Sequence, residues 1–392
     1  MSILKNLIKT DKRCLRIFLM NMVVKGILGF IRFRKRIKNG SMFPAFQFIS
    51  VTNNCNLHCQ GCWVEVNGPK INIEPEKIDA VIRAGKKYGS YFFGILGGEP
   101  LLYDGLFDIF EKHPDCYFQL FTNGTLLTKS TAQRLRRAGN VTPLISLEGD
   151  EYVADIRRGG HRIYNRTVEA IETSVSEGLI TGVAISVCKS NFEMAVSDEF
   201  VNMLHDSGVI YLWYYIYRPS GSDPHYELAL NTSEITKLRN FIVDARTRLP
   251  LILIDSYWNE KGIPFCPAIA GLSHHINPSG DIEPCPVIQL SCENLQYGEP
   301  GSLYENSLFL REFKEQLREK TNGCILMEDP AWLVHFSENH KAKNTSNREN
   351  YLTSLLKAPS IPSHSSSPLI PEKKLLYRIA KKTAFFGLGA YG

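Results

Sequence analysis

The chain has 392 residues, of which 44% are hydrophobic and 22% charged, and its formal net charge is +5 at pH 7. This length and composition are typical of a globular protein with a large core and argue against a disordered one. Its ten cysteines indicate thiolates kept for metal in a reducing compartment, because disulfides are rare in the cytosol and we identify no cleavable signal sequence. We therefore expect a cytoplasmic protein.

Residues 1–40 form a basic N-terminal segment, with eleven Lys or Arg and a single Asp. Polar and apolar residues recur there at helical spacing on opposite faces. The polar face carries Asn21, Lys25, Gly29, Arg32 and Arg36, and the apolar face carries Met20, Val23, Ile27, Phe30 and Ile31. The uninterrupted apolar length falls short of the about 20 residues that span a bilayer. Two interpretations stay open: peripheral attachment to the inner face of a membrane through residues 13–38, or docking of the helix on the core with its basic face in water.

Three cysteines in the run VTNNCNLHCQGCW follow the first apolar run with CxxxCxxC spacing: Cys55, Cys59 and Cys62. Three thiolates so placed can hold three irons of a 4Fe-4S cluster and leave the fourth iron open to another ligand. A zinc knuckle that adds His58 as a fourth ligand, or a redox dithiol, would use the same spacing. The cysteines alone leave these alternatives open.

Apolar β-like runs alternate with amphipathic helical stretches along the core, which predicts a parallel sheet with outer helices. The six β-like runs are Phe46–Val51, Tyr91–Leu96, Tyr117–Phe121, Thr142–Leu147, Gly182–Cys188 and Ile210–Ile216. The helical stretches between them are Pro75–Tyr88, Thr128–Ala138, Tyr164–Glu177 and Glu193–Ser207. A further helix is expected at Ser233–Thr247.

Short polar motifs follow these runs, at the end of the sheet where barrel enzymes keep their chemistry. They are Gly97-Gly98-Glu99-Pro100 after the second run, Thr122-Asn123-Gly124 after the third, Ser146-Leu147-Glu148-Gly149 at the end of the fourth, and then Asp155-Ile156-Arg157-Arg158-Gly159. Each motif alone would more often be an ordinary turn. They are informative because they occur as a series, one after another along the predicted runs.

The series from the cysteine motif to Arg158 resembles the radical S-adenosylmethionine (radical SAM) enzymes, over roughly Phe43–Ile216. The resemblance implies an α/β fold, an open partial (β/α)6 TIM-like barrel. It also implies that the three cysteines are catalytic and hold the cluster. SAM would be cleaved reductively there to a 5′-deoxyadenosyl radical that abstracts hydrogen from a substrate. The segment Gly97–Pro100 would bind the amino end of SAM, Ser146 its ribose and Arg158 its carboxylate, with Asn123 among the SAM contacts.

Three positions depart from the family pattern. Glu148 replaces the usual Asp and Ala154 the usual His, and Gly61 stands where many relatives have an aromatic residue beside the adenine. Trp63, one step after the third cysteine, is a candidate to stack on the adenine instead, and a place in the core is the alternative.

A second cysteine group lies at the far end of the core, in CPAIAGLSHHINPSGDIEPC, where Asn277–Asp281 predicts a hairpin turn. This spacing resembles the opening of the SPASM and Twitch extensions of radical SAM enzymes, which hold auxiliary clusters. The later cysteine set of a full SPASM region is absent from the sequence, so we expect at most one auxiliary cluster. The candidate ligands are Cys266, Cys285 and Cys324, with Cys292 as the fourth. A structural zinc, unpaired buried cysteines, or ligation by His274 or His275 remain alternatives.

The sequence divides into four parts: a basic segment 1–40, the barrel 41–250, the cluster region 251–328 and a C-terminal extension 329–392. The extension contains a Pro/Ser-rich linker at Ala358–Pro371 and a basic tail at 372–392 with five Lys or Arg and one Glu. The whole chain is +5 and its two ends carry +10 and +4, which leaves −9 for residues 41–371. This acidic core argues against nucleic-acid binding.

We predict a radical SAM enzyme that takes electrons from a donor such as flavodoxin or ferredoxin. Its substrate is unknown and could be a peptide, a lipid or a small metabolite. Alternation along the sixth run would turn some of its residues into the barrel, where they could touch substrate, although core packing explains most of them. These residues are Tyr211, Trp213, Tyr214, Tyr215, Tyr217 and Arg218. The rival hypothesis is a zinc or iron–sulfur binding protein without catalysis.

Overall fold

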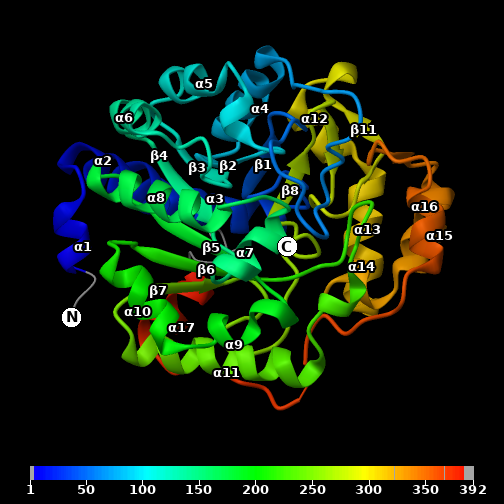
Figure 1. Cartoon of the computed structure of the whole chain (residues 1–392). Helices are drawn as coiled ribbons and strands as arrows, with labels where there is room; N and C mark the ends of the chain where they lie inside the picture. The colour runs from blue at the N-terminus through cyan, green and yellow to red at the C-terminus, as the bar shows by residue number, and fades with distance from the viewer. Residues whose placement is uncertain (1–3, 322, 366, 384–392) are drawn as a thin grey trace.

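The structure is a computed structural model, and it describes residues 4–321, 323–365 and 367–383 (Figure 1). Its centre is a sheet with the strand order β11-β9-β8-β1-β2-β3-β4-β5-β6-β7. Strands β1 to β7 are all parallel to their neighbours. Their bounds are Phe46–Ser50 (β1), Phe92–Leu96 (β2), Tyr117–Thr122 (β3), Val141–Ser146 (β4), Gly182–Val187 (β5), Tyr211–Ile216 (β6) and Ile252–Asp255 (β7). The six predicted runs all form strands, and β7 is a further parallel strand that the pattern did not predict.

Helices connect the parallel strands and cover the outside of the sheet (Figure 1). They are α4 (Pro75–Lys87), α5 (Leu106–Lys112), α6 (Lys129–Ala138), α7 (Glu151–Arg158), α8 (Ile163–Ser176), α9 (Phe192–Ala195), α10 (Asp198–Asp206) and α11 (Thr232–Arg248). Their ends follow capping signals in the sequence: Asn231 and Glu234 form a capping box at the start of α11. The helix predicted at Glu193–Ser207 is divided into α9 and α10, because the Ser197 side chain caps a new start by accepting the Phe200 N–H.

The region after β7 extends the sheet beyond β1. Strand β8 (Ser273–Ile276) is parallel to β1, and β9 (Asp281–Glu283) returns antiparallel to β8. The predicted hairpin turn lies between them, where Gly280 has a φ of 85° and the Asn277 side chain accepts the Asp281 N–H at 3.0 Å. The remaining elements here are β10 (Leu290–Ser291), β11 (Glu293–Asn294), α12 (Pro300–Asn306), α13 (Leu308–Lys320), α14 (Ile325–Glu328), α15 (Pro330–His340), β12 (Lys343–Asn344) and α16 (Tyr351–Lys357).

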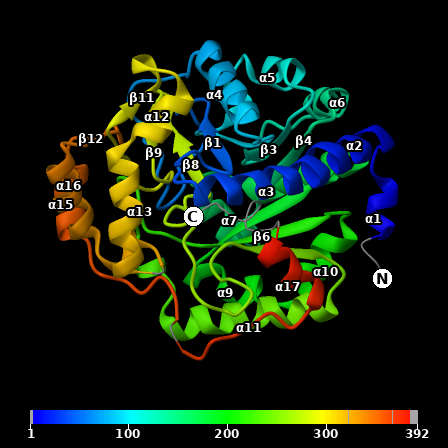
Figure 2. The same ribbon diagram turned by 180° about the vertical axis from the view of Figure 1, so that it is seen from behind.

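The N-terminal segment crosses the bottom of the barrel, where the strands begin (Figure 2). It forms α1 (Leu4–Lys9), α2 (Lys12–Ile17), the π-helical η1 (Phe18–Val24) and α3 (Lys25–Lys38). Asn6 donates to His205 O at 2.7 Å, before β6, and Asn21 donates to Cys116 O at 3.1 Å, before β3. Met22 and Phe33 are buried in one cluster with barrel residues Phe46, Phe48, Phe92, Leu96, Tyr117 and Leu272. The segment therefore closes the bottom of the barrel.

The side of α3 that docks is the one predicted to be polar. Lys25 donates to Asp115 O at 2.7 Å and Arg36 to Phe43 O at 3.0 Å. A Cβ on Gly29 would lie 2.4 Å from Gly89 O, so the two backbones are in close approach. The helix docks on the core, as one of the two interpretations expected, but with Lys25 and Arg36 of its polar face bound to loop carbonyls of the barrel instead of facing water.

The predicted apolar face of this helix is divided between barrel and solvent. Phe30 packs inward against the barrel cluster. The exposed residues of that face are Met20, Val23, Ile27 and Ile31. Among the described residues one helix, Lys12–Lys38, is long and apolar enough to cross a membrane when judged by length and composition alone.

The C-terminal extension ends in α17 (Leu375–Thr383), which is tied to β7. Lys381 Nζ lies 2.8 Å from Asp255 Oδ1, and Glu372 Oε1 lies 2.7 Å from Arg239 Nη1 and 2.5 Å from Arg246 Nη1. These five side chains are at most 4% exposed. The part of the predicted basic tail at 384–392 lies outside the described residues.

Candidate active site

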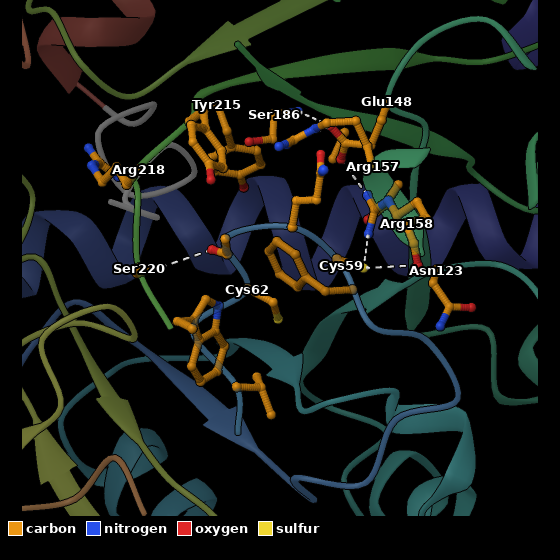
Figure 3. A pocket seen from close by; sticks show the side chains of 18 of the residues that line it. Cys59, Cys62, Asn123, Glu148, Arg157, Arg158, Ser186, Tyr215, Arg218 and Ser220 are labelled. Atoms are coloured by element: carbon orange, nitrogen blue, oxygen red, sulfur yellow. Dashed lines mark hydrogen bonds and ion pairs between the residues drawn. The ribbon is translucent and has the colours of Figure 1, made fainter. Parts of the chain in front are cut away.

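A cavity of about 250 Å³ lies at the ends where the strands finish, on the opposite side of the barrel from the N-terminal helix (Figure 3). Its walls come from the loops after β1, β2 and β3 and from the ends of β4, β5 and β6. Eight predicted site residues line it: Cys55, Cys59, Cys62, Gly97, Gly98, Asn123, Ser146 and Arg158. Glu99 and Pro100, predicted in the same set, are buried behind it and do not line it.

The loop that carries the cysteines and the loop that carries the glycines are joined through their backbones. Gly98 N donates to Thr52 O at 2.8 Å, and Glu99 N donates to Asn54 O at 2.8 Å. A Cβ on Gly98 would lie 2.4 Å from Asn54 O, so any larger residue would push the loops apart. Glycine at this position therefore keeps the cysteine loop against β2.

The surroundings of the three cysteines favour thiols bound to iron over thiols free in solvent. Burial raises the pKa of Cys55 to about 11 and that of Cys62 to about 12, because a thiolate loses its hydration there. Unligated, the thiols of Cys55 and Cys62 would stay protonated at neutral pH, whereas a bound metal replaces the proton. Asn123 Nδ2 lies 4.0 Å from Cys55 Sγ, and Arg158 Nη1 lies 3.7 Å from Cys59 Sγ. Three soft donors with adjacent N–H groups fit a cluster that keeps one iron open.

Glu99 faces away from the cavity. One carboxylate oxygen accepts the Thr122 hydroxyl at 2.8 Å and the Leu101 N–H at 3.1 Å, and the other accepts the Asn123 N–H at 2.8 Å. Full burial raises its pKa to about 7 against these hydrogen bonds. The carboxylate therefore joins the loop after β2 to the loop after β3, and only the glycines of the motif present their backbone to the cavity.

Glu148, which departs from the family pattern, holds both arginines that follow it. Its carboxylate is ion-paired with Arg158 and lies 3.7 Å from Arg157 Nη2, and it accepts the Ser186 N–H at 3.2 Å. Burial lowers the pKa of Arg158, but the charges of Glu148 and Cys59 outweigh that effect and raise it. Arg157, which lies in the same motif as Arg158 but had no assigned role, also lines the cavity. Its Nε and Nη1 are buried and have no hydrogen-bond partner among the described residues.

Tyr217 occupies the space beside Gly61. A Cβ on Gly61 would lie 1.9 Å from the Tyr217 hydroxyl oxygen, and Gly61 has a φ of 66°. The Tyr217 hydroxyl donates to Pro224 O at 2.6 Å, and the Arg157 guanidinium lies 4.6 Å from its ring centre. Both Tyr217 and Trp63 line the cavity, and Trp63 also packs edge-on to His275. The aromatic residue closest to the missing position is therefore Tyr217, from the end of β6.

Three of the four cysteines in the second group lie near one another. Cys266, Cys285 and Cys324 lie within electrostatic reach of one another, and burial raises the pKa of Cys266 and Cys285, with the neighbouring thiols adding to it. The half-buried Arg218 lies among the three and also lines the cavity. Cys292 does not join them: it is exposed, and its thiol contacts His340 O at 3.5 Å. The prediction of Cys292 as a fourth ligand is not supported by this placement.

The two histidines are engaged elsewhere. His275 is bound through Nε2 to Ser50 Oγ at 2.7 Å and through Nδ1 to Glu283 at 2.6 Å. His274 stacks on Tyr304 with ring centres 5.5 Å apart. Among the described residues, no three His, Cys, Asp or Glu side chains are grouped closely enough to hold a single metal ion. A preformed zinc site is thus missing from the described parts, while a cluster brings its own irons and sulfides and needs its ligands further apart.

Comparisons with known proteins agree with this arrangement. Residues 49–194 match the Radical SAM superfamily, which covers β1 to β5 and the loops that carry the cysteines, the glycines and Arg158. An AdoMet-dependent heme synthase of Oleidesulfovibrio alaskensis is 21% identical over 76% of this chain and 84% of its own length. A probable GTP 3′,8-cyclase of Methanocaldococcus jannaschii is 32% identical over 36% of this chain and 49% of its own.

Solved structures share the fold. SuiB of Streptococcus suis, bound to S-adenosylmethionine, aligns with a TM-score of 0.61 and 20% identity over 72% of this chain and 70% of its own. The structure titled native anSMEcpe with bound AdoMet aligns with a TM-score of 0.55 and 15% identity over 87% of this chain and 96% of its own. The predicted partial barrel is confirmed. The match identifies residues 49–194, which carry most of the loops around the cavity, as a radical SAM domain; members of that superfamily are enzymes that use a 4Fe-4S cluster and S-adenosylmethionine.

Proposed function

We propose that this enzyme cleaves SAM reductively at a cluster held by Cys55, Cys59 and Cys62 and abstracts hydrogen from a substrate bound in the same cavity. The observation that carries the proposal is the convergence of these thiols, the glycine backbone and Arg158 on one cavity. The cluster and SAM supply, when bound, the one-electron cleavage of a carbon–sulfur bond and the hydrogen abstraction. The protein supplies ligands, orientation and a partly dry site.

The remaining residues position SAM. The backbone of Gly97 and Gly98 is free of side chains at the cavity wall and suits the amino end of SAM. Arg158 carries a fixed positive charge that suits its carboxylate, and Glu148 holds the Arg158 guanidinium in place. Ser146 and Asn123 offer polar groups on the wall from β4 and from the loop after β3. Glu99 acts as a positioning residue because it bonds the loops after β2 and β3 without reaching the cavity.

We assign an auxiliary cluster to Cys266, Cys285 and Cys324. Three thiols within reach of one another, two of them buried, support it, and the Arg218 guanidinium beside them would offset the negative charge of their thiolates. Arg218 also reaches the cavity, so the two sites are neighbours. The assignment leaves Cys292 as an ordinary exposed thiol.

The substrate is proposed to carry an anionic group. Two guanidinium groups from different elements, Arg157 and Arg218, line the cavity, and each has a buried nitrogen without a partner among the described residues. Such groups bind a carboxylate or phosphate well. A peptide, a small acid or a nucleotide would satisfy this requirement, and electrons would come from a donor such as flavodoxin or ferredoxin.

The test is anaerobic reconstitution with iron and sulfide, followed by dithionite and SAM and measurement of 5′-deoxyadenosine. The wild-type protein should form it, and Cys59→Ala should not. Cys292→Ala is the matched control and should behave like the wild type. Equal product from Cys59→Ala would refute the assignment. Metal binding with intact SAM would favour the non-catalytic rival.

A further inference from the structure

Seven large apolar side chains on the outer side of the N-terminal helix (Lys12–Lys38) are exposed. They are Leu19, Met20, Val23, Val24, Ile27, Leu28 and Ile31, with exposed fractions from 37% to 59%. Their spacing places them along one side of a helix, so they form a continuous stripe. Isolated exposed apolar residues are common, but a contiguous stripe marks an interaction site.

The barrel does not account for this stripe, because the helix already docks through its other side. Asn21, Lys25 and Arg36 bind loop carbonyls, and Met22 and Phe33 fill the barrel bottom. The outward position of the stripe is therefore fixed by the docked side.

A second end of the chain brings similar side chains to the same side of the molecule. Figure 2 shows α17 on the side where α2 and α3 lie. In α17, Leu375 and Leu376 are each 66% exposed, and in α1, next to α2, Ile8 is 76% exposed. We call the stripe together with Leu375 and Leu376 the bottom face.

The positive charge around the stripe indicates what kind of partner binds it. Basic residues lie at both ends of the stripe, and residues 12–38 contain no Asp or Glu: Lys12, Arg13 and Arg16 precede it, and Arg34, Lys35 and Lys38 follow it. Around Leu375 and Leu376, Lys374, Arg378 and Lys382 are exposed cations, whereas Lys381 is buried in its ion pair with Asp255. A second copy of this chain would bring these cations against one another, whereas an anionic bilayer attracts each by about 1 kcal/mol and accepts the apolar side chains between them.

We propose that the bottom face binds an anionic membrane, with the N-terminal helix lying in the plane of the headgroups. A spanning orientation would break the contacts of Asn21 and Lys25 with the barrel. The cavity opens at the opposite end of the strands, so it faces water, and the substrate reaches it from the aqueous side. This inference does not depend on the proposed chemistry.

The experiment is flotation of the full-length protein with vesicles of phosphatidylcholine alone or mixed with phosphatidylglycerol. The wild type should float only with the anionic vesicles and less at high salt. Leu28→Gln with Ile31→Gln should reduce the bound fraction by at least about tenfold, because two inserted side chains become polar. Leu308→Gln with Leu356→Gln removes equally exposed apolar groups elsewhere, at 60% and 51%, and should not change it.

Thermal unfolding should show that both double variants stay folded. Absence of flotation at low salt, or equal flotation of the Leu28/Ile31 variant, would overturn the proposal. A dimer in solution that this variant disrupts would assign the face to a second copy instead. Resistance to alkaline carbonate extraction would show a spanning helix and would equally refute in-plane binding.

Discussion

At the scale of single residues, the departures from the family pattern have local causes. Glu148 is one methylene longer than aspartate and reaches two arginines and the Ser186 N–H together. Gly61 is required because Tyr217 fills the space beside it and because its φ is 66°. Glu148 and Gly61 thus each fit a contact with another residue of this chain.

The auxiliary ligands give a prediction at this scale. Reconstituted wild-type protein should hold about eight irons per chain, in two clusters of four. Cys324→Ala should lower the content to about four, because one of three converging thiols is lost, and Cys292→Ala should leave it near eight. Iron and zinc analysis of the purified proteins measures this. About four irons in the wild type, with zinc present, would favour a structural zinc.

At the scale of elements, helix α17 is held by a buried ionic group rather than by its sequence neighbours. Asp255 at the end of β7 meets Lys381 of α17, and two arginines of α11 surround it. Burial alone would raise the pKa of Asp255, but Lys381, Arg246 and Arg239 outweigh it and hold the pKa well below 3.8. The tail is therefore part of the fold as far as Thr383.

Asp255→Asn should lower the free energy of unfolding by about 3 to 5 kcal/mol at pH 7, because it leaves buried cations unpaired. The Asp255 contribution is fully present above pH 3.8 and is lost as the pH falls below that value, since its folded pKa is lowered. The free energy of unfolding of the wild type, measured in urea, should thus fall more steeply below pH 3.8 than that of the variant. Asp198→Asn, in the exposed pair with Arg248, is the matched control and should cost less than about 1 kcal/mol. An equal effect of the two variants would contradict this account.

At the scale of the whole molecule, the barrel has two ends with different tasks. The strands finish at the cavity and begin under the N-terminal helix, which closes the core. This arrangement leaves the chemistry at one end and the bottom face at the other.

Removal of residues 1–40 should therefore destabilise the barrel itself. Phe46, Phe92 and Tyr117 would lose their cover, and each buried aromatic side chain is worth about 2 kcal/mol. A lower melting temperature and binding of a hydrophobic dye would show it. The Leu28→Gln, Ile31→Gln variant, changed only on exposed positions, should keep the wild-type melting temperature. An unchanged melting temperature of the truncated protein would mean that the helix is not part of the core.

The βα order of the barrel and the positions of its site motifs could be predicted from the sequence, because both depend on local periodicity and short spacing. The six strands lie where alternation and apolar runs predicted them, and eight predicted residues meet at one cavity. The comparisons with known proteins do not test the individual roles of those residues, so these roles stay predictions.

The face of the N-terminal helix that docks and the residues that complete the site depend on contacts between segments far apart in the chain, which local patterns do not contain. Periodicity shows that a helix has two faces, but Asn21 and Lys25 turn inward because loop carbonyls about 90 residues further along the chain accept their hydrogen bonds. The sequence motifs assigned no role to Arg157 and did not decide which residues at the end of the sixth run enter the barrel; Arg157, Tyr217 and Arg218 line the cavity because the fold brings α7 and the end of β6 there. The separation of Cys292 from the other three thiols has the same origin: spacing along the chain does not fix distance across a fold.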